Sequence, residues 1–340
     1  MRSRLSPLRL AVAGAILLVA VFAYMVTQKS DKLLEVPDKA HSLTGLIRVP
    51  GTSRRQDGGG IYYVDVVLQK ASLLQAASKL FRPEGADLIS QNEFVPTGLT
   101  YGQQLKVDAE TMTVSQKKAS VVALRALGLK FPAREGGVRV AAIDSDSRAR
   151  GVLKPQDVVV AADGRKIATT LDLFNALGRH RPGDVVSIGV LRNGKRLGFR
   201  IKTIADKTEP GRPLIGFAPI EVVNARLPVP VHFDLGRDVG GPSAGLAFAL
   251  EVLEQRGRDV DHGLKIAATG EIQLDGSVTS IGGVKQKTIG ARQAHVDAFL
   301  VPVDGDNAKV AKRYAHGLRI IPVKNFQQAL QALATLPRNS

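Results

Sequence analysis

Two residues of this chain, Ser243 and Lys287, have the types and the surroundings that nucleophilic chemistry requires. Ser243 lies in the run DVGGPSAG at residues 238–245, and Lys287 closes the run GGVKQK at residues 282–287. A serine hydroxyl is a weak nucleophile at neutral pH unless a neighbouring base accepts its proton, and a desolvated lysine amine can be that base. Burial disfavours the charged ammonium, so a lysine in an apolar pocket can lose its proton near neutral pH. The pair therefore predicts a serine nucleophile that a lysine activates.

Two helix starts are expected to position this pair. The stretch 242–255 begins with a proline, whose missing N–H costs nothing in the first turn of a helix, and it continues with mostly apolar residues. The N–H groups and the dipole at a helix start can stabilise a developing oxyanion, so the amides from Gly241 to Ala244 are the expected oxyanion site. A second helix, at about 284–294, follows a glycine pair and is expected to carry Lys287 into the same cleft.

The ordered set of these motifs resembles the proteolytic domain of the Lon protease family over residues 208–337. The resemblance implies that Ser243 and Lys287 form a catalytic dyad, in which Lys285 takes no part. It also implies that Thr269 helps to hold the lysine amine. The expected reaction is hydrolysis of peptide bonds.

Neighbouring residues refine this expectation. Where the Lon family usually has an aspartate before Gly-Pro-Ser-Ala-Gly, this chain has Gly240. Glu271 is predicted either to be a polar neighbour of the site or to cap a turn. His232 and Asp234 could suggest a Ser-His-Asp triad, but they lie on an alternating segment, 229–235, that is typical of a strand.

The sequence predicts neither a metal nor a cofactor. The six histidines are dispersed without a metal-ligand spacing, and cysteine is absent, so no thiolate ligand, thiol nucleophile or disulfide is available. Lon proteases proper carry an ATPase module before the proteolytic domain, whereas this sequence contains no Gly-x-x-x-x-Gly-Lys-Ser/Thr phosphate loop. ATP-independent hydrolysis is therefore expected, unless another chain supplies the motor.

An apolar segment near the N-terminus indicates a membrane helix. Residues Leu10 to Thr27 are almost unbroken apolar, and at about 1.5 Å per residue they span most of a bilayer core. Three arginines precede this segment, so the positive-inside rule predicts a cytoplasmic tail at residues 1–9 and extracytoplasmic domains after the helix. The alternative is a cleaved signal peptide, for which Val21 and Ala23 offer only a weak small-residue site.

The basic composition does not indicate nucleic-acid binding. The formal net charge is +16, but the basic residues are scattered, aromatic residues make up 5% and tryptophan is absent, so a base-stacking platform is not expected. Attraction to an anionic membrane surface or a cell-wall polymer is one explanation of the charge, and simple solubility is another.

The middle of the chain divides into two predicted parts. Residues 28–108 carry strand signals at 44–49 and 61–68 and a helical pattern at 72–81, and a membrane-proximal spacer or packing layer is expected there. Residues 109–205 combine an amphipathic helix with short, glycine-punctuated strands that resemble a PDZ domain.

A PDZ domain implies binding of a chain end. Such domains add an extended peptide to a sheet edge, and backbone N–H groups catch its carboxylate. The resemblance marks Leu127, Gly128 and Leu129 as the expected carboxylate loop. The alternative is that these residues only join a helix to a strand.

Residues 208–340 show strands alternating with helices, which predicts an α/β domain with parallel strands and right-handed crossovers. The expected strands are 265–269, 298–303 and 318–323, and the expected helices are 306–315 and 325–336.

These features predict a membrane-anchored, ATP-independent serine endopeptidase that combines an α/β Lon-type domain, a small mainly-β PDZ domain and an N-terminal transmembrane helix. The expected partners are protein or peptide substrates, unfolded or C-terminally tagged, and other copies of the chain, because Lon-type domains form rings. A non-catalytic membrane scaffold with a structural Lon-like domain is the rival hypothesis. A regulatory protease that cleaves one partner is a third.

Overall fold

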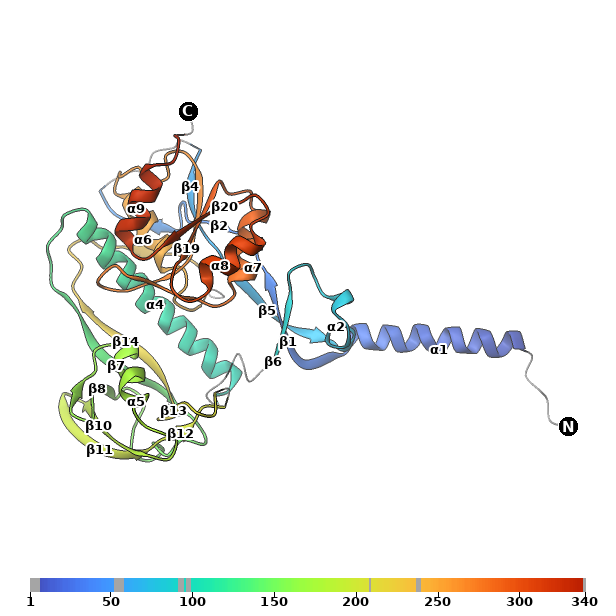
Figure 1. Ribbon diagram of the computed structural model, residues 1–340, viewed down its shortest axis with the longest axis horizontal. Coiled ribbons are helices and arrows are strands. Elements are labelled where there is room, and N and C mark those ends of the chain that lie inside the picture. Colours follow the sequence, from blue (N-terminus) through green and yellow to red (C-terminus); the bar gives the residue numbers. More distant parts are fainter. Residues whose placement is uncertain are drawn as a thin grey trace.

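The computed structural model describes residues 7–51, 58–90, 95, 99–207, 209–236 and 240–338. Asp238 and Val239, which open the motif around Ser243, lie outside the described residues, as do residues 1–6 of the predicted tail. The described chain forms a projecting helix, a small sheet at its base, a helix-flanked α/β unit and a mainly-β unit (Figure 1).

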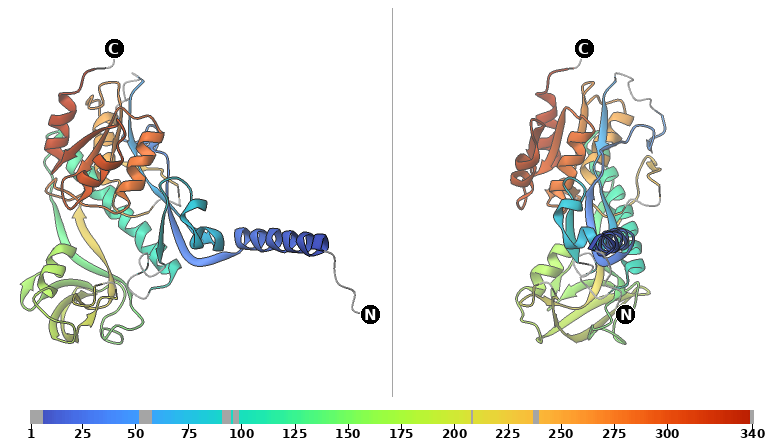
Figure 2. Two further views of the ribbon diagram at one scale, coloured as in Figure 1. Left: turned by 45° about the vertical axis from the view of Figure 1, so that its right-hand side comes forward. Right: turned by 90° about the vertical axis from the view of Figure 1, so that its right-hand side faces the viewer.

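Helix α1 (Pro7–Thr27) projects away from the rest of the molecule, and none of its residues is buried (Figure 2). Its 21 residues correspond to about 30 Å, the thickness of a bilayer core. Among the described residues, α1 is the helix that is long and apolar enough to cross a membrane, a test that a signal sequence also passes.

A three-stranded antiparallel sheet lies at the base of α1, in the order β5-β1-β6. Its strands are β1 (Lys29–Pro37), β5 (Val66–Ser72) and β6 (Asp87–Ser90). The predicted helix at 72–81 is divided into α2 (Leu73–Ala77) and the 3-10 helix η1 (Lys79–Phe81). The division occurs because the Ser78 side chain accepts a hydrogen bond from the amide of Leu80 and so starts a new turn.

The α/β unit is built on a five-stranded sheet with the order β2-β4-β16-β19-β20. Its strands are β2 (His41–Ser42), β4 (Gly60–Tyr63), β16 (Lys265–Ala268), β19 (Ala298–Pro302) and β20 (Arg319–Val323). The pairs β4–β16, β16–β19 and β19–β20 are parallel, which confirms the predicted pairing of the last three strands. Strand β4 comes from the region 28–108, so residues 208–340 alone do not complete this sheet.

Helices cover both faces of this sheet. Alternate residues along a strand point to opposite faces. Ile266 and Leu300 accordingly belong to one apolar cluster, whereas Ala267 and Phe299 belong to another. The first cluster packs against α4 (Tyr101–Ala126), α6 (Gly245–Gln255) and α9 (Phe326–Ala334), and the second against α7 (Val284–Gln293) and α8 (Asn307–Tyr314). The result is a three-layer α/β arrangement.

The mainly-β unit contains a sheet whose main path is β11-β10-β8-β7-β14, with β9 beside β8. Its strands are β7 (Ala133–Ile143), β8 (Val158–Ala162), β9 (Arg165–Lys166), β10 (Val185–Arg192), β11 (Lys195–Lys202) and β14 (Phe217–Ala225). The unit also holds α5 (Thr170–Leu177) and the short pair β12 (Ile204–Ala205) and β13 (Pro213–Leu214). Strand β14 follows residue 208 but pairs with β7, so the mainly-β unit continues beyond the predicted boundary.

Helix α4 joins the two units. It starts at a capping box in which Thr100 and Gln103 exchange hydrogen bonds, and it packs against α6 of the α/β unit and against β14 of the mainly-β unit (Figure 1). Two short strand pairs complete the described α/β unit: β3 (Ile47–Arg48) pairs with β15 (His232–Phe233), and β17 (Glu271–Ile272) pairs with β18 (Val278–Thr279).

Candidate active site

Ser243 lies in the turn that leads into α6. The helix begins at Gly245 with Ala244 as its N-cap, so it starts three residues later than the proline pattern predicts. The carbonyl oxygen of Ser243 accepts hydrogen bonds from the amide of Gly270 at 2.8 Å and from the hydroxyl of Thr269 at 3.1 Å. Both donors follow strand β16. The end of that strand therefore fixes the backbone of the candidate nucleophile.

The amides predicted as an oxyanion site differ in their availability. Gly241, at a φ of 82° that favours glycine, donates its amide to the carbonyl oxygen of Asp108 at 3.0 Å. In the described part of the chain, the amides of Ser243 and Ala244 donate no hydrogen bond. Of the predicted donors, these two are the ones that can serve an oxyanion without breaking an existing bond.

Gly240, the departure from the Lon motif, lies against α4. A Cβ at this position would stand 2.9 Å from the Cβ of Asp108. The glycine therefore lets α4 approach the nucleophile loop more closely than any side chain would. A further hydrogen bond, from the hydroxyl of Ser115 to the carbonyl of Pro242 at 3.0 Å, attaches the loop to the same helix.

Lys287 is buried within α7, which begins after Gly283 at a φ of 68°. Its exposed fraction is 4%, and burial lowers the pKa of its amine to about 8, although the negative charges of Asp65 and Glu35 act in the opposite direction. A lysine with such a pKa has a neutral, proton-accepting fraction near neutral pH. In the described chain no hydrogen bond joins the Ser243 hydroxyl to the Lys287 amine, and the Thr269 hydroxyl binds the Ser243 backbone rather than the lysine.

The region 28–108 packs against α7, the helix that carries Lys287, and forms hydrogen bonds with it. A Cβ on Gly283 would stand 2.7 Å from a carboxylate oxygen of Glu35 in β1. Asp87 in β6 accepts hydrogen bonds from Lys285 at 2.6 Å and from Gln286 at 2.8 Å. Sequence patterns did not identify these carboxylates, because nothing local connects them to a helix about 200 residues later in the chain. Lys285, by contrast, donates its hydrogen bond to Asp87, and its exclusion from the dyad stays a prediction.

Glu271 belongs to a buried polar cluster around Lys118 of α4. The Lys118 ammonium pairs with Glu221 of β14, donates to the side chain of Gln273 at 2.6 Å and lies 3.5 Å from Glu271. Glu221 also accepts a hydrogen bond from the amide of Thr170 at 2.8 Å, just before α5. Thus Glu271 is linked through Lys118 to the mainly-β unit, and Lys118 and Glu221 are members of this network that the sequence did not predict.

His232 and Asp234 do not form a triad. Among the described residues, Asp234 pairs with Arg48 at 3.7 Å, and its side chain is 74% exposed. The predicted strand around them is reduced to β15, and no hydrogen bond joins the two side chains in the described structure.

The predicted carboxylate loop is a helix terminus. The amides of Leu127, Gly128 and Leu129 donate to carbonyl oxygens of the last turn of α4, and Leu127 packs against the core of the α/β unit. These N–H groups are therefore engaged and cannot catch a carboxylate, so the structure supports the linking role instead.

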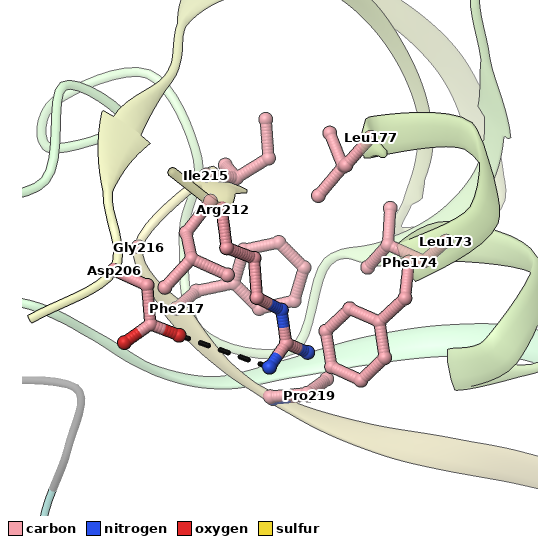
Figure 3. Close-up of a pocket in the computed structure, with 10 residues that line it drawn as sticks. Leu173, Phe174, Leu177, Asp206, Arg212, Ile215, Gly216, Phe217 and Pro219 are labelled. Carbon is pink, nitrogen blue, oxygen red and sulfur yellow. Dashed lines mark ion pairs between the residues drawn. The ribbon is translucent and has the colours of Figure 1, made fainter. Parts of the chain in front are cut away.

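An apolar pocket of about 210 Å³ lies elsewhere in the mainly-β unit, between α5 and the strands β13 and β14 (Figure 3). Leu173, Phe174 and Leu177 line it from α5. On the opposite side Arg212 pairs with Asp206 at 3.8 Å, and its guanidinium lies 4.6 Å from the centre of the Phe174 ring.

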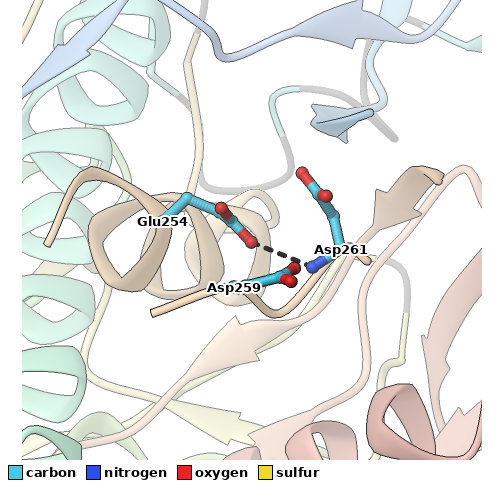
Figure 4. A group of neighbouring side chains, drawn as sticks. All are labelled: Glu254, Asp259 and Asp261. Atoms are coloured by element: carbon cyan, nitrogen blue, oxygen red, sulfur yellow. Dashed lines mark hydrogen bonds between the residues drawn. The ribbon is translucent and has the colours of Figure 1, made fainter. Parts of the chain in front are cut away.

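Three carboxylates of the α/β unit gather at the end of α6: Glu254 in its last turn, and Asp259 and Asp261 in the segment that follows (Figure 4). Their oxygens already have structural roles. Glu254 accepts from the amides of Val260 and Asp261, and Asp261 accepts from the amide of Gly263. The group stabilises the turn before β16.

Comparison with protein families assigns both units. A family model for PDZ domains matches residues 125–203, and a model for the Lon protease (S16) C-terminal proteolytic domain matches residues 226–335. The chain is 36% identical over 100 residues to a Lon protease of Buchnera aphidicola, an alignment that covers 28% of this chain and 13% of that protein. It is 33% identical over 108 residues to Lon protease 2 of Bacillus subtilis, covering 32% and 19%. The chain thus matches only a small part of these relatives' length.

Among solved structures, the PDZ domain of the SdrC-like protein from Listeria monocytogenes is similar to this chain. The sequence identity is 28%, the match covers 25% of this chain and 87% of the other, and the TM-score is 0.23. The two family models, by themselves, confirm the two expected resemblances and their order along the chain.

Proposed function

Since the chain carries a PDZ domain followed by a Lon-type (S16) serine peptidase domain, we propose that it is a membrane-anchored serine endopeptidase with Ser243 and Lys287 as its catalytic dyad. The observation that supports this most directly is the burial of Lys287, which lowers its pKa to about 8. Such an amine can accept the serine proton at physiological pH, whereas an exposed lysine cannot.

The proposed reaction gives each of these residues one role. Ser243 Oγ attacks the scissile carbonyl carbon while Lys287 accepts the hydroxyl proton, and the lysine returns that proton to the leaving amine as the C–N bond breaks. A water molecule, deprotonated by Lys287, then attacks the acyl-enzyme ester, and the proton returns to Ser243 Oγ as the carboxylic acid product leaves. The amides of Ser243 and Ala244 donate to the oxyanion. Proton transfer requires hydrogen-bond distance, so we expect the Ser243 side chain to turn towards Lys287 when a substrate docks.

The PDZ domain then recruits substrates by their C-termini. The pocket between α5 and β14 accepts an apolar C-terminal side chain, since Leu173, Phe174 and Leu177 line it. Within the described chain, the amides of Ile215 and Gly216 beside this pocket donate no hydrogen bond, and Arg212 places a cation there. These groups suit a terminal carboxylate.

The remaining parts of the proposal concern location and assembly. Helix α1 anchors the protein, residues 1–9 remain in the cytoplasm, and the PDZ and peptidase domains lie outside it. The substrates are unfolded or C-terminally tagged extracytoplasmic proteins, and the chain associates with copies of itself. Extraction of membranes with alkaline carbonate tests the anchor: a chain that retains its N-terminus in the pellet supports it, and a soluble, shortened chain indicates signal cleavage.

Digestion of unfolded casein and a diverse peptide mixture by the purified full-length chain tests the dyad. We expect cleavage without nucleotide, unchanged by added ATP, and its loss in Ser243→Ala and Lys287→Ala. Lys285→Gln is the matched control, because Lys285 lies two residues from the dyad lysine but contacts Asp87. Cleavage that persists in Ser243→Ala would overturn the mechanism. Loss in Lys285→Gln as severe as in Lys287→Ala would remove the assignment of Lys287 as the base.

A further inference from the structure

A basic cleft of about 380 Å³ lies between the segment that follows α2 and the outer faces of α7 and α8. Four cationic side chains line it: Lys79 and Arg82 from the N-terminal segment, and Lys285 and Arg292 from α7. Glu84 is the acidic member of the lining. Cations from two segments far apart in sequence converge on this cleft, so it favours an anionic occupant.

Two of the four cations have a carboxylate partner: Lys285 pairs with Asp87 at 2.6 Å, and Arg292 with Glu84. For Lys79 and Arg82 the described residues supply no ion-pair partner. Arg82 donates from Nε to the carbonyl of Gln75 at 2.8 Å, which fixes its guanidinium at the rim. Arg292 pairs at 3.1 Å with Glu84, whose side chain is 76% exposed. Exposed pairs of this kind contribute little stability, so a better anion can replace Glu84 at low cost. Guanidinium and ammonium groups arranged in this way match the oxygens of a phosphate group.

The cleft lies beside the end of the candidate membrane helix. The rings of Phe81 in η1 and Phe22 in α1 meet edge to face at 6.1 Å between centroids. Phe22 lies five residues before Thr27 at the end of α1, which corresponds to about 7.5 Å along the helix axis. Leu80, between Phe81 and the cleft residue Lys79, is 85% exposed. If α1 spans the bilayer, η1 therefore lies at the depth where apolar side chains enter the membrane and cations meet headgroups.

We propose that this cleft binds the phosphate-containing headgroup of an anionic phospholipid in the leaflet from which α1 emerges. The inference rests on the membrane anchoring in the proposed function, but not on peptidase activity. The headgroup would contact Lys79, Arg82 and Arg292, and through Arg292 it would touch α7, the helix that carries Lys287. Its acyl chains would extend along Leu80 and Phe81 towards α1.

Native mass spectrometry of the full-length Ser243→Ala chain in detergent tests the site without any need for catalysis. The probes are dihexanoyl phosphatidylglycerol, which is anionic, and dihexanoyl phosphatidylcholine, which is zwitterionic. We expect the anionic lipid to bind about tenfold more tightly, and the double variant Lys79→Gln, Arg292→Gln to weaken its binding by about tenfold or more. Lys70→Gln is the matched control, because Lys70 is exposed on the neighbouring strand β5 and does not line the cleft.

Two further arms separate the site from its alternatives. Glu84→Gln removes a competing carboxylate and should tighten lipid binding, a gain that partial unfolding cannot produce. Inorganic phosphate should displace the lipid only in large excess. Displacement by equimolar phosphate would overturn the lipid assignment. Equal binding of the two lipids, or binding unchanged in the double variant, would overturn the site. Failure of the anchor alone would instead appear in carbonate extraction.

Discussion

The backbone amide of Gly270 donates a hydrogen bond to the carbonyl oxygen of Ser243 over 2.8 Å, which attaches the end of strand β16 to the loop before α6. Thr269 donates its hydroxyl to the same carbonyl at 3.1 Å and is fully buried. The sequence resemblance assigned Thr269 to the lysine, whereas in the structure it holds the serine. The short segment Thr269–Gly270 thus positions the candidate nucleophile through its backbone carbonyl.

Replacing Thr269 by valine removes the hydroxyl while keeping the shape of the side chain. We expect kcat to fall by about tenfold with little change in KM, because the nucleophile is displaced but substrate contacts remain. Stability should fall by about 1 kcal/mol, the usual contribution of one hydrogen bond. Thr269→Ser should restore kcat. Steady-state kinetics on a peptide substrate measure this, and an unchanged kcat in Thr269→Val would show that the Gly270 bond is sufficient.

The pH dependence of cleavage should report the amine of Lys287. Its pKa is about 8, and only the neutral amine accepts a proton, so kcat/KM should rise tenfold per pH unit below that value and level off above it. The negative charge of Asp65 stabilises the ammonium and so raises this pKa. Asp65→Asn should therefore lower it, moving the acidic limb of the profile by about one unit towards lower pH.

Asp87→Asn is the control for this experiment. Asp87 also binds α7, but through Lys285 and Gln286, and it is not among the groups that shift the pKa of Lys287. The acidic limb of the pH profile of Asp87→Asn should therefore coincide with that of the parent chain. A shift of the Asp65→Asn limb towards higher pH would contradict the electrostatic explanation.

The sequence predicted those parts of the site that local patterns encode. The glycine-rich motifs predicted Ser243 and Lys287 at two helix starts; Ser243 lies in the turn before α6 and Lys287 in the first turn of α7, and their catalytic roles stay a prediction. Alternating strands and helices predicted the parallel sheet, which the registers confirm. A strand was predicted at 61–68, and β4 lies partly within it. Its parallel pairing with β16 could not be predicted, because β16 lies about 200 residues away and pairing depends on the whole fold. The positions of Asp65 and Glu35 near Lys287 could not be predicted for the same reason.

The prediction that Leu127, Gly128 and Leu129 bind a carboxylate has a different weakness. A glycine between apolar residues fits a helix terminus as well as a binding loop, so the sequence pattern alone does not distinguish the two.

Lys118 is a buried cation that sequence patterns did not identify, and its replacement gives a third prediction. In sequence it is one cation among many on an amphipathic helix, yet its side chain is 2% exposed and contacts Glu221 and Gln273. Lys118→Met would leave the carboxylate of Glu221 without its cation inside the interface between the two units. We expect a loss of about 3–5 kcal/mol in the free energy of unfolding. Urea denaturation of the full-length chain measures it.

The comparison for Lys118→Met is Arg48→Gln. Arg48 pairs with Asp234 at 3.7 Å, but the two side chains are 68% and 74% exposed. Water screens such a pair, so its loss should change stability by less than about 1 kcal/mol. Equal effects of the two substitutions would contradict the distinction between a buried and an exposed cation.

A fourth prediction concerns the contact between α7 and the region 28–108. The α-carbon of Gly290 lies so close to the carbonyl oxygen of Asp38 that an added Cβ would collide with this backbone atom. The amide of Ala40 also donates to the carbonyl of Gly290 at 3.3 Å. Gly290→Ala must therefore push the segment 38–40 away from α7. We expect a loss of about 1–3 kcal/mol in stability, as for other overpacked sites.

Activity should fall together with stability in Gly290→Ala, because the displaced segment belongs to the region that supplies Asp65 and Glu35 to the surroundings of Lys287. Gly102→Ala provides the matched control: it lies in α4 with nothing within 4 Å of an added Cβ. Alanine there should stabilise the helix by about 0.5–1 kcal/mol. Thermal unfolding and peptidase assays of both variants test this prediction.

If Gly290→Ala lowered stability but left the pH profile and kcat intact, the contact between the N-terminal region and α7 would have a structural role only. A loss of kcat at temperatures where the variant remains folded would mean that the contact between the N-terminal region and α7 controls the surroundings of Lys287.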